Sequence, residues 1–344
     1  MIRVLLADDS LLTRAVLCDL LARDPGIQII AEVGDGRAAV EQTALLKPDL
    51  VIMDVMMPVM DGIEATAEIM ASSPVPILML SANTDPNDSR SAFSAIRLGA
   101  LDVMAKPAGI TTDAFAALAD QLIAKVRSLS RIRVMHHFRP RRPASTPVAV
   151  PHPVAGKRRI LAIGASTGGP KVVVQLLKEL PADFAATVLI VQHIADGFAP
   201  GFAEWLDRET ALPVALARDG DALSPGQVLV APNGVHLTIS GARRVALVGS
   251  APLHNCRPAV DALFQSLAAA HLGRETVGVI LTGMGNDGAA GLLALRQQGA
   301  FTVAQDEASC AVFGMPKVAI ECGAVDQVLP LGEMVRAVQP LFAG

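Results

Sequence analysis

Short apolar runs alternate with amphipathic stretches along the first 130 residues of the chain. Runs of this kind, bounded by polar or small residues, are typical of buried strands, and the stretches between them have the spacing of helices. The predicted strands are Val4–Ala7, Ile27–Val33, Leu50–Met53, Ile77–Leu80 and Leu101–Met104. Strands that alternate with helices predict a doubly wound α/β domain with a five-stranded parallel sheet.

The same alternation resumes after Lys157. The predicted strands are Ile160–Ala165, Ala186–Gln192, Val228–Ala231, Val277–Leu281 and Phe301–Gln305. The predicted helices are Pro170–Leu180, Pro200–Glu209, Pro258–His271, Ala289–Gln298 and Pro316–Glu321. We therefore expect a second doubly wound α/β domain over residues 158–344, with a mostly parallel sheet.

The segment between the two domains differs in composition from both. Residues 131–159 hold five prolines and eight Lys or Arg but no acid, so they bury too little apolar surface to order themselves. Net charge is −9 over residues 1–120, +10 over 121–159 and −5 over 160–344. We expect domains at 1–125 and 158–344, joined by a basic, proline-rich linker at 126–157.

Composition narrows the class of protein further. Apolar residues make up 51% of the 344 residues, which is enough for two ordinary cores. The four cysteines are scattered without a Cys-x-x-Cys pair, which argues against a zinc knuckle or a disulfide framework. Acids at Asp8 and Asp9 interrupt any signal-peptide core, and no apolar stretch could span a bilayer. We expect a cytoplasmic protein without membrane insertion.

Polar side chains stand at the ends of four predicted strands in the first domain. Asp8 and Asp9 follow the first strand, Asp54 the third, Ser81 the fourth and Lys106 the fifth. The carboxyl ends of parallel strands meet at one edge, where ligands bind. Three clustered carboxylates favour a hard cation, so we expect Asp8, Asp9 and Asp54 to hold Mg²⁺. Each residue alone could be an ordinary helix cap; their convergence favours a site.

A second set of chemically active residues follows strands of the other domain. Ser166 lies in a small-residue turn between a strand and a helix, and Gly164 and Gly168 leave room for a strained nucleophile elbow. His193 follows the next strand, and Asp287 follows a later one. A serine hydroxyl needs a base and a third group that orients the base, and these three residues provide those roles.

The order Ser, His, Asp along the chain differs from that of α/β-hydrolases and of both common serine protease families. Backbone N–H groups of Met284 and in the neighbourhood of Thr167 are the predicted oxyanion donors.

Each of these features has an alternative interpretation. The glycines at 164, 168 and 169 could form a degenerate dinucleotide-binding turn, although that fold expects an acid where the chain has Gln192 and His193. His193 could be a satisfied buried histidine. Asp287 could cap the helix that starts at Ala289. The occurrence of all three at strand ends of one sheet favours a catalytic triad.

The first domain resembles a response-regulator receiver domain over residues 1–125. The resemblance is carried by the pair Asp8-Asp9, the run Asp54–Gly62 and the step Lys106-Pro107. It implies a flavodoxin-like fold and phosphorylation of Asp54 by a partner histidine kinase. Ser81 would donate to a phosphoryl oxygen and Lys106 would supply a countercharge.

Residues 158–342 resemble the effector domain of the chemotaxis response-regulator protein-glutamate methylesterases. The motifs are Gly164–Pro170, Val191–His193, Cys256–Asp261, Leu281–Gly291, Gln305–Glu307 and Val312–Pro316. The resemblance implies a phosphorylation-activated serine hydrolase that uses no cofactor for the ester chemistry. Its substrates would be γ-glutamyl methyl esters on methyl-accepting chemotaxis receptors, with deamidation of certain receptor glutamines as a related activity.

Two other classes of protein are consistent with parts of the sequence. A receiver followed by a basic linker also suits a transcription regulator that binds nucleic acid. The second domain, however, is acidic and has no helix-turn-helix pattern, so we expect no nucleic-acid partner. A catalytically silent adaptor is the third class, and the joint presence of Ser166, His193 and Asp287 argues against it.

Overall fold

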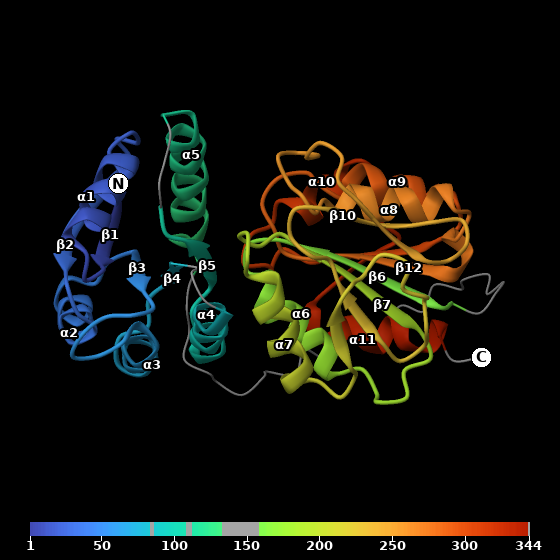
Figure 1. Cartoon of the computed structure of the whole chain (residues 1–344), viewed down its shortest axis with the longest axis horizontal. Coiled ribbons are helices and arrows are strands. Elements are labelled where there is room, and N and C mark those ends of the chain that lie inside the picture. Colours follow the sequence, from blue (N-terminus) through green and yellow to red (C-terminus); the bar gives the residue numbers. More distant parts are fainter. Residues whose placement is uncertain (83–85, 108–111, 133–157, 343–344) are drawn as a thin grey trace.

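The computed structural model describes residues 1–82, 86–107, 112–132 and 158–342. Two α/β domains lie side by side, the amino-terminal one drawn in blue to teal and the carboxy-terminal one in green to red (Figure 1). Most of the predicted linker, residues 133–157, lies outside the described residues.

The amino-terminal sheet has five parallel strands in the order β2-β1-β3-β4-β5. The strands are β1 (Ile2–Ala7), β2 (Ile27–Val33), β3 (Leu50–Asp54), β4 (Ile77–Ser81) and β5 (Asp102–Ala105). The helices are α1 (Leu11–Leu21), α2 (Gly36–Leu46), α3 (Gly62–Ser72), α4 (Pro86–Leu98) and α5 (Thr112–Leu129). β3 and β4 are buried along their whole length because helices cover both faces of the sheet. The flavodoxin-like prediction is confirmed.

The carboxy-terminal sheet has seven strands in the order β14-β13-β12-β6-β7-β9-β8, and every neighbouring pair is parallel. They are β6 (Ile160–Ala165), β7 (Thr187–Gln192), β8 (Val214–Leu216), β9 (Val228–Val230), β12 (Thr276–Ile280), β13 (Phe301–Gln305) and β14 (Gln327–Leu329). A separate antiparallel hairpin pairs β10 (His236–Ile239) with β11 (Val245–Val248). The mostly parallel sheet of the prediction is confirmed.

Helices pack on both faces of this larger sheet. The α-helices are α6 (Gly169–Lys178), α7 (Ala199–Glu209), α8 (Val260–Ala269), α9 (Ala289–Gln297), α10 (Met315–Glu321) and α11 (Leu331–Val338). Two short 3-10 turns, η1 (Gly273–Glu275) and η2 (Gln339–Leu341), complete the described elements. In Figure 1, α8, α9 and α10 lie on one side of the sheet and α6, α7 and α11 on the other.

All ten predicted strands are present, with small differences at their ends. Four further strands, β8, β10, β11 and β14, were not predicted; they have only three or four residues and mixed burial. Such short strands carry no apolar run long enough to be recognised. In the described part of the chain, no helix has both the length and the apolar character needed to cross a membrane.

The two domains meet where α4 packs against α7 (Figure 1). Phe93 of α4 is fully buried, with its ring 5.6 Å from Trp205 and 5.5 Å from Phe202 between centroids. Arg97 at the end of α4 lies 4.0 Å from the carboxylate of Glu209. Because aromatic rings dominate interface energetics, this cluster anchors the amino-terminal domain on the second one.

Candidate functional site

Ser166 lies in the turn between β6 and α6, as the sequence predicted. Gly168, which caps α6, has φ of 75°, a left-handed conformation that a side chain would strain. Gly164 is required for a different reason from the one expected. A Cβ at this position would come within 2.3 Å of the Val260 side chain, so Gly164 lets β6 and α8 approach closely rather than relieving the turn.

His193 directly follows β7, and Asp287 lies in the loop between β12 and α9. Their side chains meet: His193 Nε2 is 2.8 Å from Asp287 Oδ2, and the two side chains are 13% and 3% exposed. The Nε2–H group donates to this carboxylate, so Nδ1 is the ring nitrogen left to gain or lose a proton. The structure therefore supports a histidine oriented by a buried acid.

Ser166 and His193 occupy equivalent positions at the ends of adjacent strands. Ala165 of β6 is in register with Gln192 of β7, and the His193 backbone N–H donates to the Ala165 carbonyl at 2.9 Å. The Gln192 side-chain amide donates to the carbonyl oxygens of Ser166 at 2.7 Å and His193 at 2.9 Å. The backbone thus fixes both residues side by side.

The Ser166 hydroxyl itself makes no hydrogen bond to His193 or to any other described residue. Its side chain is half-buried, and Gly283 packs closely against it. A Cβ added at Gly283 would lie only 2.7 Å from the Ser166 Cβ. Catalytic hydrogen bonds often tighten only when substrate is bound.

Burial and the acid act in opposite directions on His193. Burial lowers the pKa of His193, the hydrogen bond to Asp287 raises it, and the net result is a pKa of about 9. The pKa of Asp287 is lowered overall because His193 and two backbone N–H groups outweigh the effect of burial. The pair is therefore most stable as imidazolium and carboxylate.

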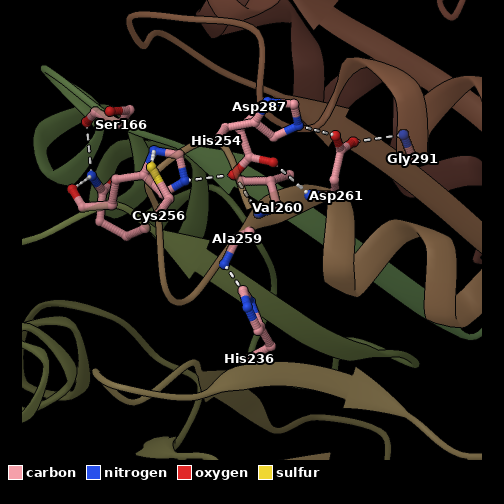
Figure 2. Close-up of polar contacts among 11 residues, drawn as sticks. Ser166, His236, His254, Cys256, Ala259, Val260, Asp261, Asp287 and Gly291 are labelled. Carbon is pink, nitrogen blue, oxygen red and sulfur yellow. Dashed lines mark hydrogen bonds and ion pairs between the residues drawn. The ribbon is translucent and has the colours of Figure 1, made fainter. Parts of the chain in front are cut away.

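Both oxygens of Asp287 are engaged by protein donors (Figure 2). Oδ2 also accepts the N–H of Val260 at 2.7 Å, and Oδ1 accepts the N–H of Asp261 at 2.9 Å. These donors are the first N–H groups of α8, so Asp287 caps α8. The alternative interpretation, in which Asp287 caps the helix that starts at Ala289, named the wrong helix. This capping holds the carboxylate still for His193.

The same region holds a second histidine–carboxylate pair. His254 Nε2 lies 2.8 Å from Oδ2 of Asp261, whose other oxygen accepts the Gly291 N–H at 2.6 Å (Figure 2). His254 is more exposed than His193 and does not follow a strand of the large sheet. The two pairs are alike in geometry, but only His193 lies beside Ser166.

The predicted oxyanion donors lie near this edge of the sheet. The Thr167 carbonyl accepts the Thr282 hydroxyl at 3.0 Å, while no hydrogen-bond acceptor among the described residues contacts the N–H of Thr167 or of Met284. The Met284 sulfur contacts the Ser128 hydroxyl of α5 at 3.6 Å. The end of α5 thus touches the loop that leads to Asp287.

Cys256 is a site residue for which the sequence suggested no role. Its sulfur lies 3.7 Å from Nδ1 of His193, whereas Asp287 contacts the other ring nitrogen, Nε2. No spacing rule connects a loop cysteine to a histidine 63 positions away, so the sequence places Cys256 in a motif but gives it no partner. Only the folded loop brings them together.

The structure brings the acids and the lysine at the strand ends of the amino-terminal domain together. Lys106 Nζ lies 2.8 Å from Asp8 Oδ2 and 2.7 Å from Asp54 Oδ2, and Asp9 joins them, with carboxylate oxygens of the three acids within 4.8 Å of one another. Burial raises the pKa of Asp54 to about 6, although Lys106 opposes this effect. Burial lowers the pKa of Lys106, but its hydrogen bonds to Asp54 and Asp8 raise it overall.

These residues fit Mg²⁺. Three carboxylates face a single ammonium, which leaves excess negative charge that a divalent cation with oxygen ligands would balance. The Ser81 hydroxyl is fully buried and has no hydrogen-bond partner among the described residues. A buried polar atom without a partner is unusual and indicates a ligand that this pocket is shaped to receive.

The fold and the two strand-edge sites define a receiver-coupled α/β hydrolase. Residues 4–116 match the family model of the response regulator receiver domain, and residues 161–338 match that of the CheB methylesterase. The chain belongs to the CheB methylesterase family and carries a receiver domain.

Named relatives cover nearly the whole chain. The protein-glutamate methylesterase/protein-glutamine glutaminase 2 of Anaeromyxobacter dehalogenans is 45% identical over 99% of this chain and 97% of its own length. The protein-glutamate methylesterase/protein-glutamine glutaminase 4 of Geobacter metallireducens is 43% identical over 99% of this chain and 99% of its own length. The crystal structure of the Thermotoga maritima CheB methylesterase catalytic domain is 38% identical, with a TM-score of 0.52, and covers 54% of this chain and 100% of its own.

Proposed function

We propose that this chain removes methyl groups from γ-glutamyl methyl esters of methyl-accepting chemotaxis receptors and deamidates certain receptor glutamines. The relatives named for both activities support this substrate class. The observation that carries the proposal is the His193–Asp287 pair beside the Ser166 turn, at the edge of one parallel sheet. Ser166, His193 and Asp287 form the catalytic triad.

Ser166 attacks the ester carbonyl while Nδ1 of His193 removes the proton from the hydroxyl. Asp287 keeps the opposite nitrogen protonated and stabilises the imidazolium that forms. The same imidazolium then protonates the leaving methanol oxygen. His193 next activates water, which hydrolyses the acyl-enzyme and releases glutamate. With a glutamine substrate, the same steps release ammonia.

The negative charge on the carbonyl oxygen develops near the start of α6. The N–H groups of Thr167 and Met284, which lack acceptors among the described residues, are the proposed oxyanion donors. One such donor typically lowers the barrier by about 3 kcal/mol. The ester chemistry uses no cofactor.

Asp54 is the proposed phosphorylation site, with a chemotaxis histidine kinase as the phosphodonor. Asp8, Asp9 and Asp54 would hold Mg²⁺, which when bound neutralises charge on the phosphoryl oxygens. The Ser81 hydroxyl donates to a phosphoryl oxygen, and the Lys106 ammonium, now shared between Asp8 and Asp54, pairs with the new negative charge.

Phosphorylation activates the hydrolase by weakening the contact between the domains. The Phe93 cluster and the contact between Ser128 and Met284 connect the receiver to the loop of the proposed oxyanion site. A change at Asp54 that disfavours this packing shifts the population towards an open substrate site.

We propose a cytoplasmic location and no nucleic-acid partner. All four cysteines are free, as expected in a reducing compartment. The match to the methylesterase family occupies the part of the chain where a nucleic-acid-binding output domain would lie. Methylated receptor segments and the kinase are then the partners.

The test is methanol release from membranes that carry methylated receptors, with and without a small-molecule phosphodonor. We expect Ser166→Ala to abolish release, as loss of a serine nucleophile lowers kcat by roughly 10⁶. The exposed Ser250→Ala variant should retain it.

Asp54→Asn should keep the basal rate but lose stimulation by the phosphodonor. Turnover by a folded Ser166→Ala protein would refute the triad. Stimulation of Asp54→Asn would refute the phosphorylation site and leave the triad intact.

A further inference from the structure

The thiol of Cys256 lies against Nδ1 of His193, the ring nitrogen that Asp287 does not contact, at the proposed active site. Together with Asp287 they place ligand atoms of three chemical kinds within 4.8 Å of one another. Both oxygens of Asp287 already accept hydrogen bonds from His193 and from α8. The atoms available for a new ligand are therefore Cys256 Sγ and His193 Nδ1.

The separation of these two atoms suits a tetrahedral metal. Zn–S bonds of about 2.3 Å and Zn–N bonds of about 2.0–2.1 Å place sulfur and nitrogen about 3.5–3.6 Å apart at a tetrahedral angle. The observed distance is 3.7 Å. The spacing of the two atoms therefore matches that of two ligands of one zinc ion.

Asp287 holds the His193 ring in place through the nitrogen that does not face the proposed metal. Histidines that bind metals almost always donate their other ring N–H to a carboxylate, which fixes the ring and increases its basicity. His193 Nε2 makes such a bond to Asp287 at 2.8 Å. A thiolate with an imidazole favours zinc over magnesium, because Mg²⁺ prefers oxygen ligands.

We propose that Cys256 and His193 form a binding site for Zn²⁺, with Asp287 as the orienting carboxylate and solvent at the remaining positions. On binding, the Cys256 thiol and Nδ1 of the His193 imidazolium each release a proton to solvent, and the sulfur coordinates the metal as thiolate. Nδ1 of His193 donates its lone pair to zinc and can no longer accept a proton from Ser166. Free zinc is therefore a reversible inhibitor of this hydrolase.

The experiment titrates the full chain, reduced and in excess Mg²⁺ to occupy the receiver, first with Co²⁺ as a spectroscopic substitute and then with Zn²⁺. We expect one equivalent of Co²⁺ to give thiolate-to-metal charge-transfer absorption in the near ultraviolet. Zn²⁺ should abolish this band, and a chelator should reverse inhibition of methanol release. Histidines elsewhere in the chain cannot produce the thiolate band.

Cys256→Ala and Cys256→Ser test the ligand, and Cys322→Ala is the matched control because Cys322 is exposed. The two Cys256 variants should lose the band. The zinc concentration that halves their own metal-free rate of methanol release should be about tenfold higher than for the wild type. Cys322→Ala should behave like the wild type. Absence of the band in the wild type, or its persistence without Cys256, would overturn the proposal. The band is measured without turnover, so this outcome is separate from a failure of the triad.

Discussion

The two strand-edge sites differ in how completely protein atoms satisfy their charges. In the receiver, three carboxylates cluster, only two of them contact the Lys106 ammonium, and the Ser81 hydroxyl lacks a partner among the described residues. In the hydrolase domain, the single acid Asp287 accepts hydrogen bonds from three protein donors. Under the function proposed above, an added cation and phosphoryl group would complete the first site, while the second is organised before substrate arrives.

The difference follows from the task of each site. A switch must change its interactions when a ligand arrives, so its charges are left unbalanced without that ligand. A catalytic acid–base pair must keep the same geometry through each turnover, so its carboxylate is fixed by backbone donors. Substitutions should therefore affect rate in the second domain and regulation or stability in the first.

The largest expected effect comes from replacing the fixed acid. Asp287→Asn keeps the shape of the side chain but removes the charge that stabilises the His193 imidazolium, so kcat should fall roughly 10⁴-fold. The matched control is His254→Gln in the second histidine–carboxylate pair, which has the same 2.8 Å geometry. Methanol release should be close to wild type in this control. Equal losses in both variants would show that the triad is misassigned.

The pH dependence of the rate tests the coupling between His193 and Asp287. Because the pKa of His193 is raised to about 9, the neutral base is the minor form at pH 7. The value of kcat/KM should rise close to tenfold per pH unit from pH 6 to 8. In Asp287→Asn, the inflection should move to lower pH, since the acid that raises the pKa is gone. An unmoved inflection would assign it to another group.

The sequence predicts the fold well where strands are long and buried on both faces. Leu50–Asp54 and Thr187–Gln192 are continuous apolar runs with a polar residue at the end, so both the strands and the site residues beside them were recognised. The short strands Val214–Leu216 and Gln327–Leu329 lie at sheet edges with partial exposure and lack this signal.

Contacts between distant loops could not be predicted in this way. Asp287 was predicted from its place after a strand, but its capping of α8 through Val260 depends on how two helices pack. The approach of Cys256 to His193 and the insertion of Phe93 between the domains likewise arise from tertiary packing. Periodicity describes one element at a time and carries no information about these pairs.

A smaller effect, a several-fold change in the basal rate of methanol release, is expected from a substitution at the contact between the domains. Phe93→Ala removes a fully buried ring from the cluster with Phe202 and Trp205, and a buried Phe→Ala change typically costs about 3–5 kcal/mol. The basal rate of methanol release should rise towards the phosphodonor-stimulated rate, and the remaining stimulation should shrink by the same factor.

The matched control for this contact is Phe184→Ala. Phe184 packs against Phe342 within the hydrolase domain, with ring centroids 4.9 Å apart. This variant should be destabilised without a gain in basal rate. A basal rate of Phe93→Ala equal to wild type, in a folded protein, would contradict regulation through this interface.

The smallest expected effect is on the stability of the receiver without Mg²⁺. The pKa of Asp54 is raised to about 6 in the folded state, so protonated Asp54 favours folding below pH 4, and this contribution is lost as pH rises through 6. Asp54→Asn mimics the protonated form and should raise the melting temperature at pH 7.5. About 1 kcal/mol corresponds to roughly 4 °C in a domain of this size.

The difference in melting temperature between Asp54→Asn and the wild type should be smaller at pH 4.5, where the wild-type Asp54 carboxyl is itself protonated. Added Mg²⁺ should also reduce this difference in melting temperature at pH 7.5, because the cation stabilises the wild type, which keeps all three carboxylates, and not the variant. Asp9→Asn is the control, since the Asp9 carboxylate is exposed and its removal relieves less repulsion. A lower melting temperature for Asp54→Asn at pH 7.5 would mean that the ion pair with Lys106 outweighs burial. The receiver pocket would then be as well satisfied without its ligands as the hydrolase site.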